Sequence, residues 1–309
     1  MEKELAYMNI RDVSDITVNG EAEIAYSDED FLIIDSAKEI KDSQPIRMGM
    51  YTIAVCKNGR VQGDMNGKTL LMEKNQILIC PPNTTIENIM TSPDYECKFI
   101  CLTNRILQAF LRPYINIWNQ AMFVNKMKVR DLDERGTDFA VKFQELLSLC
   151  IQSEAHIKYK KEVVRSLVQA GLLGLCGSLE TSMEEDKYYA PSHSSSTFRK
   201  FLDLLSNEGN MRHTVNYYAD KLCITLKYLS ILCTKNSGKT AKEWIDEYTM
   251  ENVRYYLTST DKSMKEITDI LGFPNSSYLG RYVRERFGVS PLAYRNGKGK
   301  DIKKAKEKR

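Results

Sequence analysis

The chain has 309 residues, of which 42% are hydrophobic and 28% charged, and its formal net charge is +3 at pH 7. This length allows two domains that each bury a hydrophobic core. The N-terminus, Met-Glu-Lys-Glu-Leu, lacks the apolar segment of a signal peptide, and no apolar run reaches the ~18–20 residues that span a membrane. We therefore expect a cytoplasmic protein without a membrane segment.

The first hundred residues contain short runs that are rich in strand-forming residues, at 31–35, 50–56, 76–80 and 97–102. Asn-Gly pairs at 58–59 and 66–67 are typical of tight hairpins, because a type I′ turn needs positive φ at both central positions. The pattern predicts a small antiparallel barrel or sandwich.

The strand region lacks the residues of a histidine-bound metal centre. The three histidines, at 156, 193 and 213, lie outside it, whereas a cysteine or carboxylate site stays open. The eight cysteines lie mostly in apolar segments without a Cys-x-x-Cys motif, and we interpret them as buried hydrophobic residues. The sequence also lacks nucleotide-binding and hydrolase motifs. It predicts no enzyme, no cofactor and no metal site.

A barrel of this kind can bind a small effector among its strands. Side chains suited to such a pocket stand at Tyr26, Arg47, Tyr51 and Glu87. An ordinary place in the core or on the surface explains each of them as well.

Helical periodicity follows the strands at 106–120, 133–153 and 158–179. The last segment, from Lys158 to Leu179, carries an apolar stripe that Leu173 and Cys176 widen beyond one face, so it must be buried on several sides. Two interpretations stay open: it packs against its own domain, or it forms the interface of a homodimer. Residues 181–196, with Glu-Glu-Asp, Pro191 and a serine run, lack periodicity and are expected to be an interdomain linker.

The C-terminal part contains two sets of helix signals. In the first set, Thr214 is expected to cap one short helix and Thr225 a second helix, which Gly238 ends. A capping box from Thr240 to Glu243 then opens a helix of about 19 residues, ~28 Å long at ~1.5 Å per residue.

In the second set, a capping box from Ser263 to Glu266 opens a short helix that closes at Gly272. Asn275 and the two serines after it begin another helix, which carries arginines at 281, 284 and 286 and ends at Gly288. A short helix, a tight turn and a basic helix form the arrangement that places a helix in the major groove of DNA. The long connecting helix would hold two such helices about one DNA turn, ~34 Å, apart.

The charge distribution agrees with a nucleic-acid partner. From residue 197 onward there are 22 Lys and Arg against 13 Asp and Glu, a balance of +9, while the remainder carries 22 against 28, or −6. A basic C-terminal part is expected when one domain meets phosphates and the other does not, although a solvated surface also carries such charge. Residues 298–309 hold seven Lys or Arg, and we expect the basic tail at 297–309 to be disordered.

Residues 198–295 resemble the double helix-turn-helix domain of the AraC/XylS family of bacterial transcription regulators. The resemblance is carried by Glu266-Ile267, Leu271-Gly272-Phe273, Ser277-Tyr278-Leu279, Arg281, Phe287-Gly288-Val289-Ser290-Pro291 and Tyr294-Arg295. The layout of the strand region, with its hairpins before Ile-Cys-Pro-Pro-Asn-Thr, is similar to the cupin-like sensor domain of many such regulators. The resemblance implies a promoter and RNA polymerase as partners, a homodimer, and an effector that the N-terminal domain senses.

The family's base-contacting positions fall here on Leu226, Lys227, Tyr228, Ser230 and Ile231 in the first unit, and on Ser276, Ser277, Tyr278, Gly280 and Arg281 in the second. We expect phosphate contacts from Thr225, Lys235, Asn275, Arg284 and Arg286. The family usually has an arginine where this chain has Ile231, and Gly280 stands inside a helix, so we expect looser readout by the first unit.

The sequence thus predicts an α+β protein with an antiparallel cupin-like barrel plus helices at 1–180, a linker at 181–196, an all-helical double helix-turn-helix domain at 197–296 and a tail at 297–309. Its expected function is promoter-specific transcription regulation. The alternative is a cupin-like small-molecule-binding protein whose helical domain no longer reads DNA.

Overall fold

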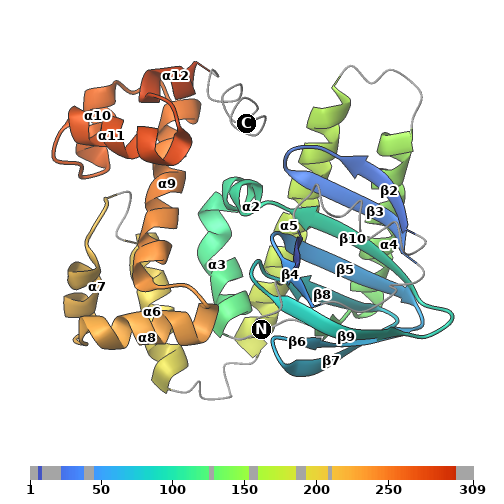
Figure 1. Cartoon of the computed structure of the whole chain (residues 1–309). Helices are drawn as coiled ribbons and strands as arrows, with labels where there is room; N and C mark the ends of the chain where they lie inside the picture. The colour runs from blue at the N-terminus through green and yellow to red at the C-terminus, as the bar shows by residue number, and fades with distance from the viewer. Residues whose placement is uncertain are drawn as a thin grey trace. The chain divides into compact units, whose positions relative to one another are not determined.

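The computed structural model describes residues 6–8, 22–37, 45–124, 129–152, 159–185, 193–207 and 211–296. The chain divides into two compact units, residues 1–188 and 189–309, which we call unit 1 and unit 2 (Figure 1). The tail predicted at 297–309 lies outside the described residues.

Unit 1 is built on two β-sheets. The first sheet has the order β1 (Ala6–Met8), β4 (Ile46–Met48), β9 (Thr85–Thr91), β6 (Arg60–Met65) and β7 (Lys68–Glu73). The second has the order β11 (Val129–Asp131), β8 (Gln76–Cys80), β5 (Tyr51–Asn58), β10 (Glu96–Leu102), β3 (Phe31–Ala37) and β2 (Ala22–Ser27). The described strands pair antiparallel, except that β1 and β4 are parallel.

The predicted fold class, an antiparallel β domain with helices followed by an all-helical domain, is confirmed, but the expected barrel is wrong. In the described part of the chain, hydrogen bonds join strands only within each sheet, so β1 and β7 stay at the edges of one sheet and β11 and β2 at the edges of the other. The two sheets therefore form an open arrangement rather than a closed barrel.

The six-stranded sheet has two differently packed faces. Alternate residues of β5 point to opposite sides, because side chains alternate along a strand. Ala54 and Cys56 belong to a buried cluster with Met72 of the other sheet, whereas Ile53 and Val55 face the helices of unit 1. The predicted hairpin at Asn66 and Gly67 is confirmed by their φ values of 51° and 70°.

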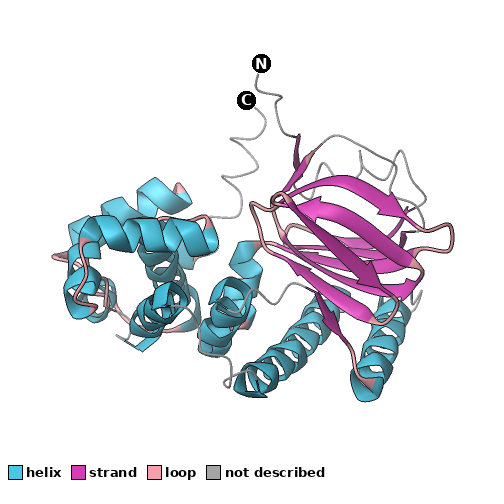
Figure 2. Ribbon diagram, turned by 90° about the horizontal axis from the view of Figure 1, so that it is seen from below, coloured by secondary structure: helices cyan, strands magenta, loops and turns pink. Residues whose placement is uncertain are grey.

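The helices of unit 1 are α2 (Asn104–Phe110), α3 (Ile115–Asn119), α4 (Glu134–Gln152) and α5 (Lys160–Glu185), and Figure 2 shows helices along one side of the sheets. Asp30, which is fully buried before β3, fastens two of these helices to the sheet. Its carboxylate accepts hydrogen bonds from Arg105 of α2 at 2.5 Å and Arg165 of α5 at 3.0 Å. A buried carboxylate needs such partners to offset its lost hydration.

The apolar stripe of α5 is largely buried within unit 1, at Val164, Val168, Leu172, Cys176 and Leu179. Among the described helices, α5 is long and apolar enough to cross a membrane by length and composition alone, with 28% of that window buried. A core helix of a soluble protein has the same length and composition.

The predicted linker at 181–196 is shorter in the structure. Helix α5 continues through its first five residues, where the Thr181 and Ser182 hydroxyls bond back to carbonyls four residues earlier. Helix α6 (His193–Asn207) begins before the predicted end of the linker, and residues 186–192 are not among the described residues.

Most cysteines are buried, as predicted, and burial raises the pKa of the Cys97 and Cys233 thiols to about 12. Cys150 is half-buried and Cys223 is exposed, so the prediction is wrong for Cys223. Cys223 lies in the exposed turn between α7 and α8, with φ of 54°.

Unit 2 is helical, with α7 (Val215–Lys221), α8 (Leu226–Ser237), α9 (Ala241–Ser259), α10 (Met264–Ile270), α11 (Ser276–Phe287) and α12 (Pro291–Arg295) after α6 (Figure 1). Phe198 of α6 packs edge-on against Trp244 of α9, with ring centroids 6.1 Å apart. The same helix meets α7 through Phe201 and Tyr218, at 5.6 Å. These buried rings join the first helices of the unit into one core.

Candidate nucleic-acid interface

Helices α8 and α11 are equivalent elements of the two helix sets: each has 12 residues, and they begin 50 positions apart, at 226 and 276. The Thr225 side chain caps α8 by accepting from the Tyr228 amide, and Asn275 caps α11 in the same way. Gly238 and Gly288 end the two helices with φ of 73° and 74°. The predicted caps and ends are confirmed, and they fix the length of each candidate recognition helix.

The turns that precede these helices are also copies. In the second unit, the amides of Gly272 and Phe273 donate to the carbonyls of Asp269 and Thr268, and Gly272 has φ of 66°. In the first unit, Cys223 and its neighbour make the equivalent bonds to α7, with a positive φ at Cys223. Each unit is therefore a short helix, a tight turn and a longer helix, the helix-turn-helix arrangement.

Helix α9 joins the two units. Its predicted capping box is present: Thr240 accepts from the Glu243 amide, and the Glu243 carboxylate accepts from the Thr240 amide at 2.6 Å. This backbone hydrogen bond lowers the pKa of Glu243 below its usual value. Nineteen residues give a rod of ~28 Å, close to the ~34 Å of one DNA turn.

One face of α8 is buried and the opposite face is exposed. Leu229, Leu232 and Cys233 are buried in unit 2. Of the positions predicted to meet bases, Leu226, Lys227, Tyr228 and Ile231 are exposed, and Ser230 is half-buried. Ile231 is 52% exposed.

Helix α11 shows the same division with different chemistry. Leu279, Tyr282 and Val283 are buried, while Ser276, Ser277, Tyr278 and Arg281 are exposed and Gly280 is half-buried. The Arg281 guanidinium lies over the Tyr278 ring, 4.7 Å from its centroid, a cation–π contact. This contact, which the sequence analysis missed, restricts a flexible side chain at the position predicted to read a base.

The residues predicted to bind phosphate have different surroundings. Lys235 and Arg284 are exposed, while Thr225 and Asn275 are the caps described above. Arg286 instead pairs with Asp246 of α9 at 2.9 Å and covers the Tyr282 ring at 3.9 Å. Its charge is therefore balanced inside unit 2 by Asp246, and its contact with phosphate stays a prediction.

The four residues guessed to line an effector pocket lie in different places. Tyr51 is buried on the helix side of the six-stranded sheet, edge-on to Trp118 at 5.9 Å. Tyr26 on β2 donates to Asp28, and burial raises its pKa to about 12. Arg47 is exposed on β4 and Glu87 half-buried on β9, both in the other sheet.

A different cavity of unit 1 has none of these four residues among those that line it. It lies between the six-stranded sheet, α4 and α5. The sequence contains only an indirect signal of this cavity: Phe139 and Phe143 stand four residues apart, and glycines recur at 171, 174 and 177. Among the described residues, no group of three or more His, Cys, Asp or Glu side chains is arranged to hold a metal ion.

Two helix-turn-helix units on one connecting helix make unit 2 a DNA-binding domain of the double helix-turn-helix class. A family model described as a helix-turn-helix domain matches residues 218–297. The match lies within unit 2 and covers α8 to α12 together with the end of α7.

The chain is similar to the transcriptional activator NphR of Rhodococcus sp, with 36% identity over 58 residues, or 19% of this chain and 17% of NphR. It is 25% identical over 143 residues to the HTH-type transcriptional regulator YijO of Escherichia coli K12, covering 46% of this chain and 49% of YijO. The chain thus spans less than half the length of either relative. The C-terminal domain of AraT, a response regulator from Geobacillus stearothermophilus, matches 34% of this chain and 88% of that domain, with 23% identity and a TM-score of 0.32.

Proposed function

We propose that the chain is a transcription regulator that binds a promoter through unit 2 and works with RNA polymerase in the cytoplasm, and that its role is not catalytic. The observation that carries the proposal is the pair of capped helices, α8 and α11, whose exposed faces hold the positions that the family uses for DNA. Residues 197–309 carry a net charge of +9, which attracts the phosphates of DNA.

In this proposal, α11 is the principal reader of sequence. The planar guanidinium of Arg281 can donate two hydrogen bonds to the O6 and N7 atoms of guanine, worth ~1–3 kcal/mol of discrimination. Ile231, its counterpart on α8, can offer only contact with a thymine methyl group. Lys235 and Arg284 would bind phosphates and fix the position of the protein without reading bases.

The test uses the full chain and duplexes selected by it from a random-sequence library. Affinity should fall linearly with salt on logarithmic axes, because bound phosphates release counterions. Arg281→Ala should lose ~1–3 kcal/mol and flatten the preference at one or two base pairs, whereas Ile231→Ala should flatten it less. Lys235→Ala should weaken all sequences evenly and reduce the salt slope by ~1.

Selection that yields no preferred sequence, together with binding that is indifferent to salt, would reject DNA readout and favour the alternative of a small-molecule-binding protein. A larger effect of Ile231→Ala on base preference would instead assign the leading role to α8. The Arg286→Ala variant should affect stability more than DNA affinity, because Arg286 is paired with Asp246.

We further propose that the chain forms a homodimer through the region from Lys158 to Leu179 together with α4. Because most of the α5 stripe is used inside unit 1, the surface available for a partner consists of exposed apolar residues such as Leu173 of α5, and Leu146 and Leu149 of α4. Leu149 is 68% exposed, and burial of such side chains drives association.

Sedimentation of the full chain tests this surface. The wild type should sediment as a dimer, and Leu149→Lys should shift it to a monomer, because a charge buried in the interface has no partner. Leu71→Lys is the matched control, since Leu71 is also exposed, at 43%, but lies on β7 away from both helices. A monomeric wild type, or a dimer unaffected by Leu149→Lys and Leu173→Lys, contradicts the proposal.

A further inference from the structure

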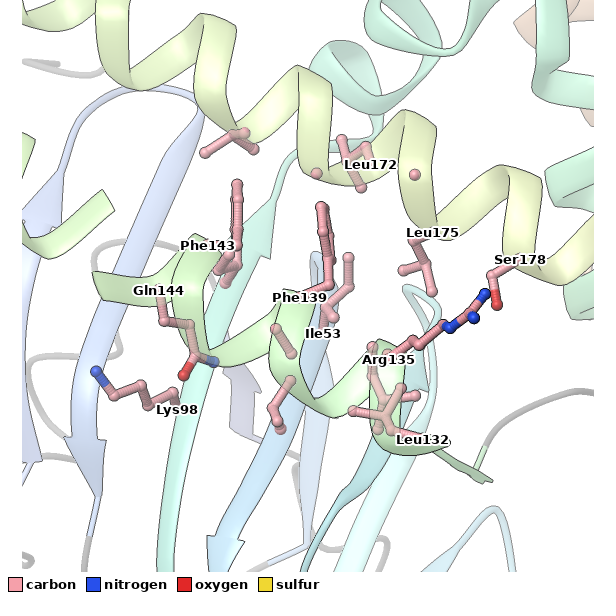
Figure 3. Close-up of a pocket in the computed structure, with 18 residues that line it drawn as sticks. Ile53, Lys98, Leu132, Arg135, Phe139, Phe143, Gln144, Leu172, Leu175 and Ser178 are labelled. Atoms are coloured by element: carbon pink, nitrogen blue, oxygen red, sulfur yellow. The ribbon is translucent and has the colours of Figure 1, made fainter. Parts of the chain in front are cut away.

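Unit 1 contains a cavity of about 340 Å³ between three elements: the helix-facing side of the six-stranded sheet, α4 and α5 (Figure 3). Isoleucines and valines of β5, β8 and β10 form its floor. The sides come from Phe139, Ala140 and Phe143 of α4, and from Leu172 and Leu175 of α5. Because the core between the two sheets lies on the other side of the strands, the cavity is separate from the pocket that sequence analysis expected among the strands.

Glycines on α5 keep the aromatic side of this cavity in place. Phe139 and Phe143 are stacked, with centroids 6.1 Å apart and an interplanar angle of 11°. A Cβ atom at Gly171 would lie 2.7 Å from the Phe143 ring, and one at Gly174 would lie 3.5 Å from Phe139. The rings therefore fill notches on α5 that any larger residue at 171 would close. This packing brings the two rings close to the α5 backbone at one side of the cavity.

The cavity is partly open to solvent, since Phe139 in its lining is 54% exposed. A volume of about 340 Å³ falls in the range of ~300–1,000 Å³ that is usual for small-molecule sites, which are mostly apolar with a few polar groups. Water gains little in an apolar cavity, because it needs two or more polar partners. The cavity is therefore suited to an apolar occupant.

The polar groups of the lining determine what charge the occupant carries. The Lys98 ammonium is already neutralised by Asp35, at 2.5 Å, and Asp35 also accepts from Ser148. Arg135, at the start of α4, points toward Ser178 of α5 in Figure 3 and forms no ion pair with any residue that the structure describes. A guanidinium without a carboxylate partner beside an apolar cavity is complementary to an anionic group.

We propose that this cavity binds a small apolar acid, whose hydrocarbon part lies between α4, α5 and the sheet and whose carboxylate pairs with Arg135. The proposal concerns unit 1 alone and does not depend on DNA binding by unit 2. Ser178 lies at the same end of the cavity and offers the carboxylate a second donor.

The probes are octanoate and 1-octanol, titrated calorimetrically into the full chain. Octanoate should bind more tightly than the alcohol. Arg135→Gln should weaken octanoate about tenfold and leave 1-octanol unchanged, because a charge-assisted hydrogen bond at an exposed guanidinium is worth roughly one factor of ten. Lys142→Gln is the matched control: Lys142 is also on α4, but it pairs with Asp138 and does not line the cavity.

Filling the cavity tests its location. Ala140→Leu should weaken both probes at least tenfold, while Val141→Leu, next to it and 43% exposed, should change neither. Leu175→Phe fills the same space from α5 and serves if Ala140→Leu does not fold. The proposal is overturned if wild-type protein binds neither probe, or if a folded filling variant binds both as well as wild type. The carboxylate–Arg135 pairing is overturned if Arg135→Gln weakens both probes equally.

Discussion

Alanine substitutions at two glycines of α11 isolate the effect of backbone conformation on stability, because an added methyl group meets no atom within 4 Å at either position. Gly280 lies inside the helix, whereas Gly288 ends it with φ of 74°. Alanine in a helix interior is more stable than glycine by ~0.8–1.0 kcal/mol, mainly because glycine loses more backbone entropy on folding. At positive φ, alanine is instead strained by ~1–2 kcal/mol.

We therefore expect Gly280→Ala to raise the free energy of unfolding by ~0.8–1.0 kcal/mol and Gly288→Ala to lower it by ~1 kcal/mol or more. The signs are opposite although neither methyl group makes a contact. For a domain of roughly this size, the first change corresponds to a rise of about 4 °C in Tm.

Tryptophan fluorescence provides the assay. The chain has two tryptophans, both buried, Trp118 in unit 1 and Trp244 in unit 2. In a Trp118→Phe background, urea unfolding followed by fluorescence reports on unit 2 alone. Destabilisation by Gly280→Ala would refute the reasoning, because it would require a contact or a backbone geometry at 280 that the structure does not have.

Three further changes probe single features. Cys223→Gly should stabilise unit 2 by ~0.5–1 kcal/mol in the same urea assay, because relief of ~1–2 kcal/mol of left-handed strain exceeds the entropy lost by glycine, and an unchanged or lower stability would contradict this. Asp30→Asn should destabilise unit 1 by ~2–3 kcal/mol, measured through the fluorescence of Trp118. The expected loss is smaller than the ~3–5 kcal/mol of a fully buried ion pair, because the Arg105 and Arg165 side chains are 41% and 27% exposed. The capping-box hydrogen bond from the Ser263 amide lowers the pKa of Glu266 in the folded state. The stabilisation from this hydrogen bond is therefore fully present above the pKa of Glu266 in the unfolded chain, and it is lost as the pH falls through the folded-state pKa. Urea unfolding between pH ~3 and ~7 should show a shallower pH dependence of stability for Glu266→Gln than for the wild type, and identical profiles would contradict this.

The predictions that held depend on residues close together in sequence. A cap such as Asn275 and a terminator such as Gly288 act within one helix, so their spacing alone determines where α11 begins and ends. The pairing of Arg286 with Asp246, 40 positions away, depends on how α11 crosses α9, and no local pattern predicts it. The open sheets and the cavity beside Phe139 have the same cause, since strand partners and helix spacing are set by packing between distant segments.

The two units have nearly the same backbone, so any difference in DNA readout must come from the exposed side chains. Helix α8 has a lysine, Lys227, at the second position and an isoleucine at the sixth, whereas α11 has Ser277 and Arg281 at those positions. A lysine at the helix start is a mobile point charge, suited to phosphate or to any acceptor within reach. Arg281 lies one turn further along and is held by the Tyr278 ring, so less side-chain entropy remains to be lost when its planar group meets guanine. If both helices enter the major groove, the α11 half of the site should therefore tolerate fewer base changes than the α8 half, and the connecting helix α9 limits how far the spacing between the halves can vary.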